Sequence, residues 1–289
     1  MRSRLRILLA VMTLGLGSLA FAGCGDDDEE SADTGSETGT EQPAEDLGLI
    51  EEGQLTVGTD APFPPFEIGE PGSPDFGGYD IDVMNAIAEQ LGVEADYTNT
   101  GFGTIFRDTA NGLFDTAAAA STITPGRENT VDFTDPYYEA QQALLVPEGS
   151  DIATVDDLGD TIVGAQDGTT GETYANDETE ASEVRGFPQG PDAISALITG
   201  QVDAVIIDQP VAADALEQQE GVEIVEEIPT NELYGFAISP DNDVLREAMN
   251  EALISLKEDG TLTELYDEYF SAEPPASVID GTNELLTDD

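Results

Sequence analysis

The chain has 289 residues, of which 62 are Asp or Glu and only eight are Lys or Arg, and its formal net charge is −54. Such a charge argues against nucleic acid and against an anionic membrane surface as partners, because both would be repelled. The chain contains no His and one Cys, which excludes Ser–His and Cys–His catalysis, His-ligated zinc sites and intramolecular disulfides, and we expect no metal and no cofactor.

The first 23 residues have the features of a secretory signal peptide. Arg occupies three of the first six positions, an apolar run follows over residues 5–22, and small residues precede Cys24. A membrane span needs about 20 residues, and this run is shorter and broken by Gly, so a cleaved signal is favoured over an anchor. Residues 21–24 resemble a bacterial lipobox with Phe in place of the usual Leu. This implies that Cys24 becomes the lipidated first residue of the mature protein.

Residues 24–46 are predicted to form a disordered acidic tether between the membrane and the folded part. From residue 25 onward the segment has ten acids and no aromatic or large aliphatic residue, so it cannot bury enough apolar surface to order itself. An acidic interaction tail is the alternative. We interpret the acidity of the whole chain as adaptation to a saline habitat, where salt screens the repulsion between carboxylates. An ordinary acidic secreted protein is the alternative to that interpretation.

From residue 47 to residue 270, short apolar strands alternate with amphipathic helices. Strands are predicted at residues 55–59, 93–98, 114–120, 143–146, 161–165, 183–187, 203–207, 222–225 and 235–239. Helices are predicted at residues 79–91, 103–110, 170–176, 191–199, 209–218, 243–258 and 261–270. Asp80 stands where it could cap the start of the first helix. The alternation predicts an α/β fold with a mainly parallel sheet that is covered on both faces.

Four segments that follow predicted strands carry residues suited to a small ligand, which in open α/β sheets lies beyond the carboxyl ends of the strands. After the first strand, Asp60 and Phe63 place a charge and an aromatic ring at the sheet edge, although a capped turn with a core Phe would also explain them. In residues 166–172, Gly residues and a helix start favour an anion. In residues 203–210, a buried strand ends at Asp208, which could instead cap the next helix.

The remaining segment, residues 121–138, is the most informative because it contains one of the few cations. Arg127 has five fixed donors suited to a bidentate grip on a carboxylate, and Thr122 and Thr124 add hydroxyl and backbone N–H donors. We therefore expect Arg127 to hold the α-carboxylate of a small ligand. A surface Arg in an ordinary salt bridge is the alternative.

Five motifs follow one another along the folded part of the chain. They are residues 77–82 (GGYDID), 122–127 (TITPGR), 132–138 (DFTDPYY), 168–171 (GTTG) and 203–208 (DAVIID). Together they make residues 55–270 resemble the extracellular solute-binding proteins of ABC importers, specifically the amino-acid-binding family. The resemblance implies a type II periplasmic-binding-protein-like fold, in which two α/β lobes close on a ligand and then present a surface to a membrane permease.

The resemblance also implies a division of the chain. Two hinge strands would lie near residues 143–147 and 229–235. The expected parts are lobe 1 at residues 47–145 and 233–272, lobe 2 at residues 146–232, and a C-terminal tail at residues 273–289.

Carried over by position, the resemblance implies a site for a zwitterion between the lobes. Arg127 would hold the ligand carboxylate, helped by Thr122 and the backbone at Thr170. Asp208, on the other lobe, would take the α-ammonium.

The ligand side chain would meet a second set of residues. The resemblance implies that Phe63 and Phe102 wall it and that Asp60 and Gln166 face its polar end. Two departures from the family pattern matter: Ala120 replaces a common Gly or Ser, and Gln166 stands where some members carry a Lys. An acidic side chain would face Asp60 unpaired, so we expect a polar neutral or cationic amino acid.

These observations predict a lipid-anchored binding protein, without enzymatic activity, on the extracytoplasmic face of the cell membrane. It would deliver an amino acid to an ABC permease. The alternatives are an enzyme on the same fold, such as a dehydratase with Asp60 or Glu67 as general acid or base, and a ligand-sensing receptor module.

Overall fold

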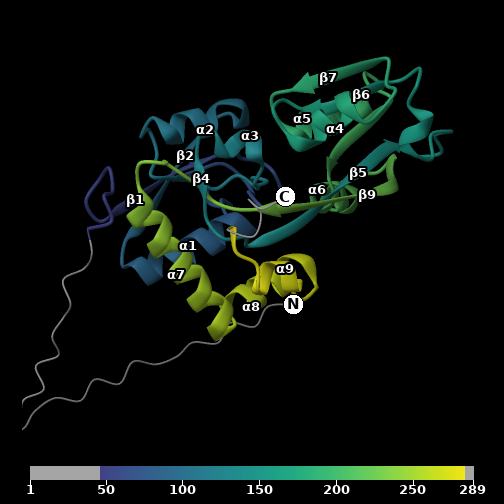
Figure 1. Cartoon of the computed structure of the whole chain (residues 1–289). Coiled ribbons are helices and arrows are strands. Elements are labelled where there is room, and N and C mark those ends of the chain that lie inside the picture. The colour runs from purple at the N-terminus through teal and green to yellow at the C-terminus, as the bar shows by residue number, and fades with distance from the viewer. Residues whose placement is uncertain (1–45, 284–289) are drawn as a thin grey trace, which may run out of the picture. The chain divides into compact units, whose positions relative to one another are not determined.

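A computed structural model describes residues 46–283 of the chain (Figure 1). The predicted signal peptide, Cys24 and the predicted tether up to residue 45 lie outside the described residues, as do residues 284–289. Within residues 46–283, no helix combines the length and the apolar character that crossing a bilayer requires. The same residues contain no group of three or more Asp, Glu or Cys side chains arranged to hold a metal ion.

The first of two five-stranded sheets contains the start of the folded part. Its strand order is β2 (Glu94–Asn99), β1 (Gln54–Thr59), β3 (Thr116–Ala117), β10 (Ala237–Ile238) and β4 (Asp132–Phe133). β1 runs parallel to β2 and β3, whereas β10 runs antiparallel to β3 and β4. β10 therefore returns to this sheet from a distant part of the chain.

The second sheet is also mixed. Its strand order is β7 (Glu183–Phe187), β6 (Ile162–Gln166), β8 (Ala204–Asp208), β5 (Tyr138–Pro147) and β9 (Val222–Tyr234). β6 is parallel to β7 and β8, and β5 is antiparallel to β8 and β9. The prediction of a mainly parallel sheet was therefore wrong, because β10 pairs antiparallel in the first sheet and β5 does so in the second.

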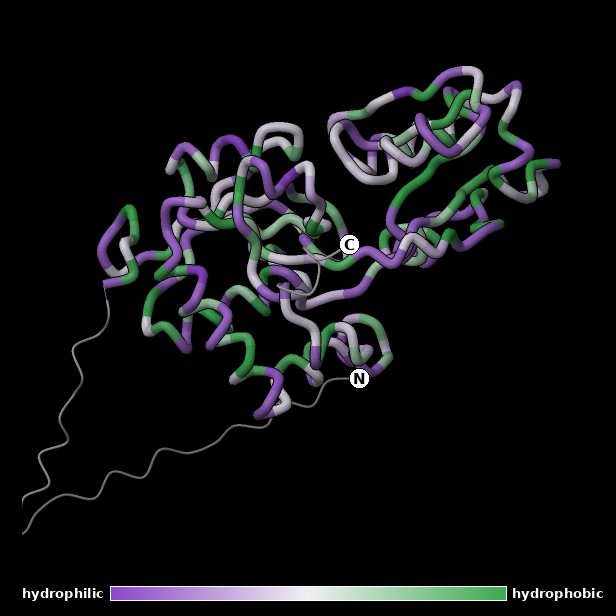
Figure 2. The backbone as a smooth tube through the Cα atoms, in the orientation of Figure 1, coloured by the Kyte–Doolittle hydropathy of each residue, from purple (hydrophilic) through white to green (hydrophobic). Residues whose placement is uncertain are grey.

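The helices cover both sheets, as the alternating pattern predicted. The helices packed with the first sheet are α1 (Tyr79–Leu91), α2 (Phe102–Ala110), α3 (Pro125–Glu128), α7 (Asp243–Asp259) and α8 (Thr261–Phe270). Those packed with the second sheet are α4 (Thr170–Asp177), α5 (Gly190–Ile198) and α6 (Gln209–Gln218), and a single 3-10 turn, η1 (Val155–Asp157), follows β5. Figure 1 shows α1 and α2 on opposite sides of the first sheet, and hydrophobic segments run through both groups of elements (Figure 2).

β5 and β9 connect the two sheets side by side (Figure 1). They pair from Tyr138 with Tyr234 to Pro147 with Val222, with register shifts along the way. Both strands are much longer than the predicted segments 143–146 and 222–225, because polar Gln, Glu and Thr residues interrupt their apolar pattern. The long pairing keeps the two connections in one ribbon.

The first helix begins as its periodicity predicted, but its cap differs. Gly78, with φ of 119°, occupies the N-cap position, and no side chain caps the helix. The prediction that Asp80 caps the helix start was wrong, because this residue turns inward and is fully buried. A side chain at Gly78 would meet the carbonyl of Phe66 at 2.2 Å, so only Gly fits this close approach.

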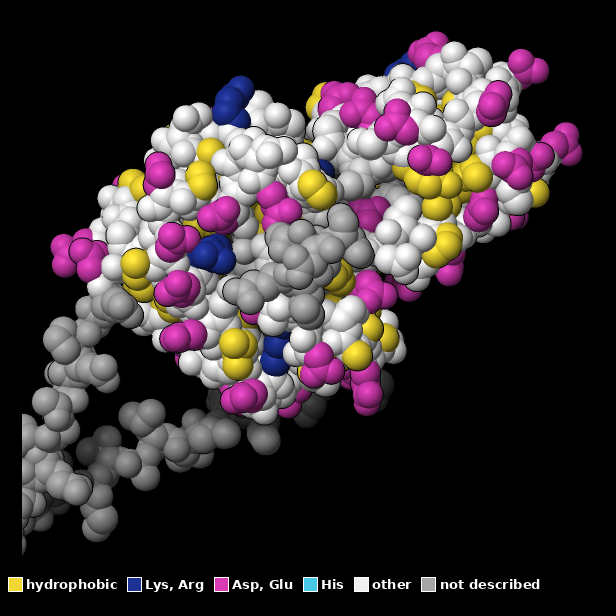
Figure 3. Space-filling view, in the orientation of Figure 1, with side chains coloured by type: hydrophobic (Ala, Val, Ile, Leu, Met, Phe, Trp, Pro, Cys, Tyr) yellow, Lys and Arg dark blue, Asp and Glu magenta, His cyan; other side chains and the backbone are white. Residues whose placement is uncertain are grey.

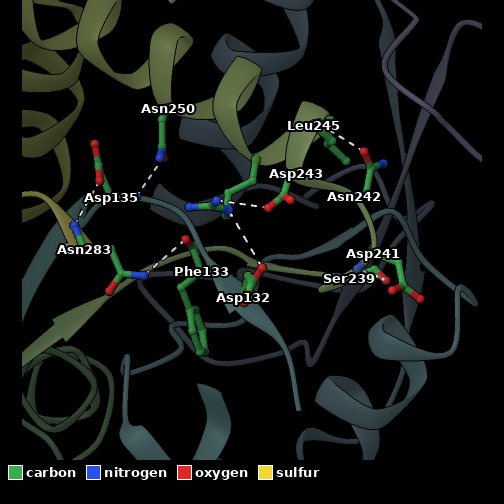
Figure 4. Close-up of polar contacts among 11 residues, drawn as sticks. Asp132, Phe133, Asp135, Ser239, Asp241, Asn242, Asp243, Leu245, Asn250 and Asn283 are labelled. Atoms are coloured by element: carbon green, nitrogen blue, oxygen red, sulfur yellow. Dashed lines mark hydrogen bonds and ion pairs between the residues drawn. The ribbon is translucent and has the colours of Figure 1, made fainter. Parts of the chain in front are cut away.

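The described part of the predicted C-terminal tail is tied to the first sheet. It contains the short helix α9 (Ala276–Ile279), in which Val278 is fully buried. The backbone N–H of Asn283 donates to Asp135 Oδ1 at 2.9 Å, and the backbone N–H of Asp135 donates to Asn250 Oδ1 on α7 at 2.8 Å (Figure 4). This segment therefore adds to the packing of the lobe that carries β4.

Candidate functional site

One narrow pocket, with a cavity volume of only about 10 Å³, is lined by residues from both lobes. Its lining residues are Asp60, Phe63, Phe102, Ala119, Ala120, Thr122, Arg127, Gln166, Thr169, Thr170 and Asp208. The nine residues that the family resemblance singled out are among them, whereas Thr124, also considered as a donor, does not line this pocket and instead caps α3. Most follow the carboxyl end of β1, β3, β6 or β8, which is where strand-exit residues of an α/β sheet converge.

Arg127 lies on α3 and is held in place from several sides. Its Nη1 donates to the carbonyl of Thr122 at 2.7 Å, and its Nη2 donates to the carbonyl of Gly168, across the cleft, at 3.2 Å. The guanidinium carbon lies 5.0 Å from the ring centre of Phe102 and 4.8 Å from that of Phe106. These bonds use two of the five N–H groups of the side chain.

Arg127 forms no ion pair with any described residue. Burial lowers its pKa to about 10, and the negative charges of Glu232 and Asp208 act against that decrease. The guanidinium is therefore charged at neutral pH and retains donors for an anion. The alternative interpretation, an ordinary surface salt bridge, has no support in the ion pairs of residues 46–283.

Asp208 is the last residue of β8 and is buried. It precedes α6 as the N-cap residue, but its side chain makes no capping hydrogen bond. Instead, its carboxylate accepts a hydrogen bond from Nε2 of Gln142 on β5. Burial and the nearby charge of Glu232 raise the pKa of Asp208 to about 7.

Asp60 and Gln166 meet across the pocket. Nε2 of Gln166, at the end of β6, donates to Oδ2 of Asp60, which follows β1, at 2.6 Å. Burial raises the pKa of Asp60 to about 6. Nearby, a side chain at Gly190 would meet the ring of Phe63 at 2.7 Å, so the first residue of α5 leaves room for the aromatic wall.

Ala120 has a backbone conformation that is unusual for a residue other than Gly. Its φ of 43° lies in the left-handed region, which costs an L-residue about 1–2 kcal/mol. Its N–H donates to Oδ2 of the buried Asp80 at 2.8 Å, and the hydroxyl of Tyr137 donates to the same oxygen at 2.7 Å. Asp80, misread as a helix cap, thus fixes the backbone beneath the pocket.

A second buried acid, Glu67, lies beside Asp80 and does not line the pocket. Burial, and then the charge of Asp80, raise the pKa of Glu67 well above its usual value. Burial likewise raises the pKa of Asp80 to about 6. Two carboxyls this close favour one shared proton over two charges.

Glu232, on β9, is a site residue that the sequence reasoning missed. It is buried, and its carboxylate accepts four hydrogen bonds, from Thr122, Thr170, Gln142 and Thr230. A period-two pattern over residues 228–234 would have placed it on the buried face with Ile228 and Tyr234. Gln142, on the neighbouring strand, was missed for the same reason.

Comparison with known proteins places the chain among binding proteins. Residues 55–272 match the family model for bacterial extracellular solute-binding proteins, family 3. The chain is 30% identical over 223 residues to the ABC transporter arginine-binding protein 1 of Escherichia coli strain K12. This alignment covers 75% of this chain and 90% of that relative.

Solved structures of amino-acid-binding proteins are also similar to this chain. An ancestral arginine-binding protein bound to arginine is 38% identical, with a TM-score of 0.71, over 75% of this chain and 98% of the other. An ancestral arginine-binding protein bound to glutamine is also 38% identical, with a TM-score of 0.73, over 77% and 100% of the two chains. The ancestral amino acid-binding protein AncCDT-1, a precursor of cyclohexadienyl dehydratase, is 35% identical, with a TM-score of 0.70, over 75% and 96%.

The predicted type II periplasmic-binding-protein-like fold, with its two α/β lobes, is confirmed by these matches and by the two sheets described above. The family match covers three quarters of the chain and includes every residue that lines the pocket. The chain therefore belongs to the bacterial extracellular solute-binding proteins of family 3.

Proposed function

We propose that this protein captures a cationic or polar neutral amino acid outside the cytoplasm and delivers it to the permease of an ABC importer. The observation that carries the proposal is the single pocket in which Arg127 from one lobe and Asp208 from the other lie together. A zwitterionic amino acid offers one anion and one cation, and this pocket offers the opposite pair. Hydrogen bonds to charged groups contribute about 1.5–3 kcal/mol each, so such a pair supports tight binding.

Each lobe contributes contacts, which couples binding to closure. The ligand carboxylate would meet Arg127 and Thr122 on the first lobe and the N-terminal end of α4 at Thr170 on the second. Its α-ammonium would meet Asp208. A ligand that touches both lobes favours the closed arrangement, which is the arrangement a permease would recognise.

The charges around the pocket favour a cationic side chain, and we propose L-arginine as the first candidate. Asp60 lines the pocket together with Phe63 and Phe102, and Gln166 supplies an amide rather than a cation. The relatives named for arginine support this choice, and the ancestral protein bound to glutamine supports a polar neutral amino acid as the second candidate. An acidic amino acid would bring a second carboxylate to Asp60.

We further propose that Cys24 carries the lipid that anchors the protein to the extracytoplasmic face of the membrane. The proposed lobes keep the boundaries expected from the sequence, residues 47–145 with 233–272 and residues 146–232. The paired strands β5 and β9 would then serve as the hinge, since they connect the two sheets.

An enzyme on the same fold is a second candidate, and one observation favours it. Asp60 has a pKa raised to about 6, which suits a general acid or base near neutral pH. Glu67, the other acid considered, does not line the pocket. Incubation with cyclohexadienyl compounds, followed by a search for a dehydrated product, tests this alternative.

Isothermal titration calorimetry of the Arg127→Ala variant tests the proposed function. The unmodified protein is expected to bind L-arginine or L-glutamine but not L-glutamate, and the variant is expected to lose measurable binding, because the ligand carboxylate would have no cation. Arg107→Ala is the matched control, since Arg107 is exposed on α2 and paired with Asp108. Undiminished binding by the Arg127 variant would refute the assignment.

A further inference from the structure

Glu232 is the most heavily hydrogen-bonded acid near the pocket. Oε2 accepts from Oγ1 of Thr122 and from Oγ1 of Thr170, both at 2.6 Å. Oε1 accepts from Nε2 of Gln142 at 2.9 Å and from Oγ1 of Thr230 at 2.8 Å. Its donors come from the segment before α3, from the first turn of α4 and from the two connecting strands, so this carboxylate joins both lobes.

Two of those donors are the residues that the proposed function assigns to the ligand carboxylate. Thr122 and Thr170 line the pocket, and Glu232 lines the adjoining groove together with both of them and Arg127. Among the charges near Arg127, Glu232 acts most strongly to keep the guanidinium protonated. The carboxylate of Glu232 is therefore recognised by the same hydroxyls, near the same cation, as a ligand carboxylate would be.

A Thr hydroxyl has a single proton to donate. When Oγ1 of Thr122 or Thr170 donates to Glu232, it cannot also donate to a second carboxylate. A ligand carboxylate can receive these two hydrogen bonds only if Glu232 releases them, and the two anions also repel each other.

We propose that Glu232 is an affinity-setting residue of the ligand site, whose carboxylate competes with the carboxylate of the ligand for the hydroxyls of Thr122 and Thr170. This inference rests on the proposed function. Glu232 would lower the affinity for ligands that carry a carboxylate. Its negative charge would at the same time attract the cationic groups of those ligands.

The test compares two ligands that differ by one group, L-arginine and agmatine, which is arginine without its α-carboxylate. Neutralising Glu232 removes competition only for L-arginine, whereas any loss of attraction for cationic groups affects both ligands. In Glu232→Gln, the affinity for L-arginine relative to agmatine is expected to rise about tenfold, because charged acceptors bind hydroxyls more strongly than amides do. Calorimetry of both ligands gives this ratio directly.

Two further variants make the result specific. Glu227→Gln removes an exposed acid from the same strand and is expected to leave the ratio unchanged. Thr230→Val removes one of the four bonds that hold Glu232 but keeps its charge, so a smaller rise, about two- to threefold, is expected. A smaller rise in Thr230→Val also supports the inference should the Glu232 variant fail to fold.

The outcomes separate the two proposals. If the unmodified protein binds no amino acid, the proposed function and this inference fall together. If it binds L-arginine but the ratio to agmatine is the same in the unmodified protein and in both the Glu232 and Thr230 variants, the inference alone is overturned.

Discussion

Carboxylates on the outer surface and carboxylates around the pocket belong to the same residue types, but the first are surrounded by water and the second by protein. Asp and Glu side chains are scattered over the visible face of the protein, where water surrounds them (Figure 3). Around the pocket, Asp60, Asp80 and Asp208 are buried, and burial raises the pKa of each above its usual value. Water stabilises the first group, and only the protein can stabilise the second.

This contrast separates two uses of acidity in one chain. Exposed acids act on solubility and on the response to salt, and each contributes little to folding. Buried acids raise the free energy of the folded protein, and a cation that reaches them recovers part of that energy. A site of this kind couples ligand binding to stability, and the three predictions below test that coupling against the surface.

The largest effect is expected from Asp208→Asn. The variant should lose about a thousandfold in affinity for L-arginine, because the α-ammonium would meet a neutral amide. Without ligand at pH 8, it should be more stable than the unmodified protein by roughly 2–4 kcal/mol, since an acid whose pKa is raised to about 7 is costly to ionise. Calorimetry and urea denaturation measure the two quantities; a variant that is less stable without ligand would contradict the account.

A smaller effect is expected from pH. Asp60 and Asp80, with pKa values of about 6, and Asp208, with a value of about 7, bind protons more tightly in the folded protein than in the unfolded chain. The free energy of unfolding should therefore fall as pH rises from 6 to 8, by about 2 kcal/mol. Denaturation in molar salt isolates the buried groups, because repulsion between surface charges is then screened.

The same titration has an internal control. Asp208→Asn should reduce the fall in stability between pH 6 and pH 8, since one of the responsible groups is gone. A profile that is flat in high salt, or that rises with pH, would show that the buried acids do not carry the dependence.

The smallest effect is expected from an exposed acid. Glu251 lies on the solvent side of α7, and Glu251→Gln should change the free energy of unfolding by less than about 0.5 kcal/mol. L-arginine affinity should not change. A larger effect, persisting in high salt, would remove the distinction between surface and pocket carboxylates.

The sequence predicted the pocket better than it predicted the strands around it. Asp208 and Gln166 end β8 and β6 of one sheet, and strand exits of one sheet converge whatever the length of the strands, whereas Arg127 comes from α3 on the other lobe. Glu232 lies instead in the interior of β9, where its residue type, one acid among 62, does not mark it as buried and only the period-two spacing with Ile228 and Tyr234 does. Asp80 was misread because an acid in the first turn of a helix usually faces outward, and here the close contact at Gly78 sets the start of the helix.

The aromatic rings beside Arg127 also offer a spectroscopic handle. The chain has no Trp, and Phe106 lies 4.8 Å from the guanidinium without lining the pocket. A Phe106→Trp variant would contain a single indole emitter stacked on that cation, an arrangement in which indole interacts more strongly than phenyl. Its fluorescence would follow the surroundings of the guanidinium during lobe movement, in a background free of other indole emission.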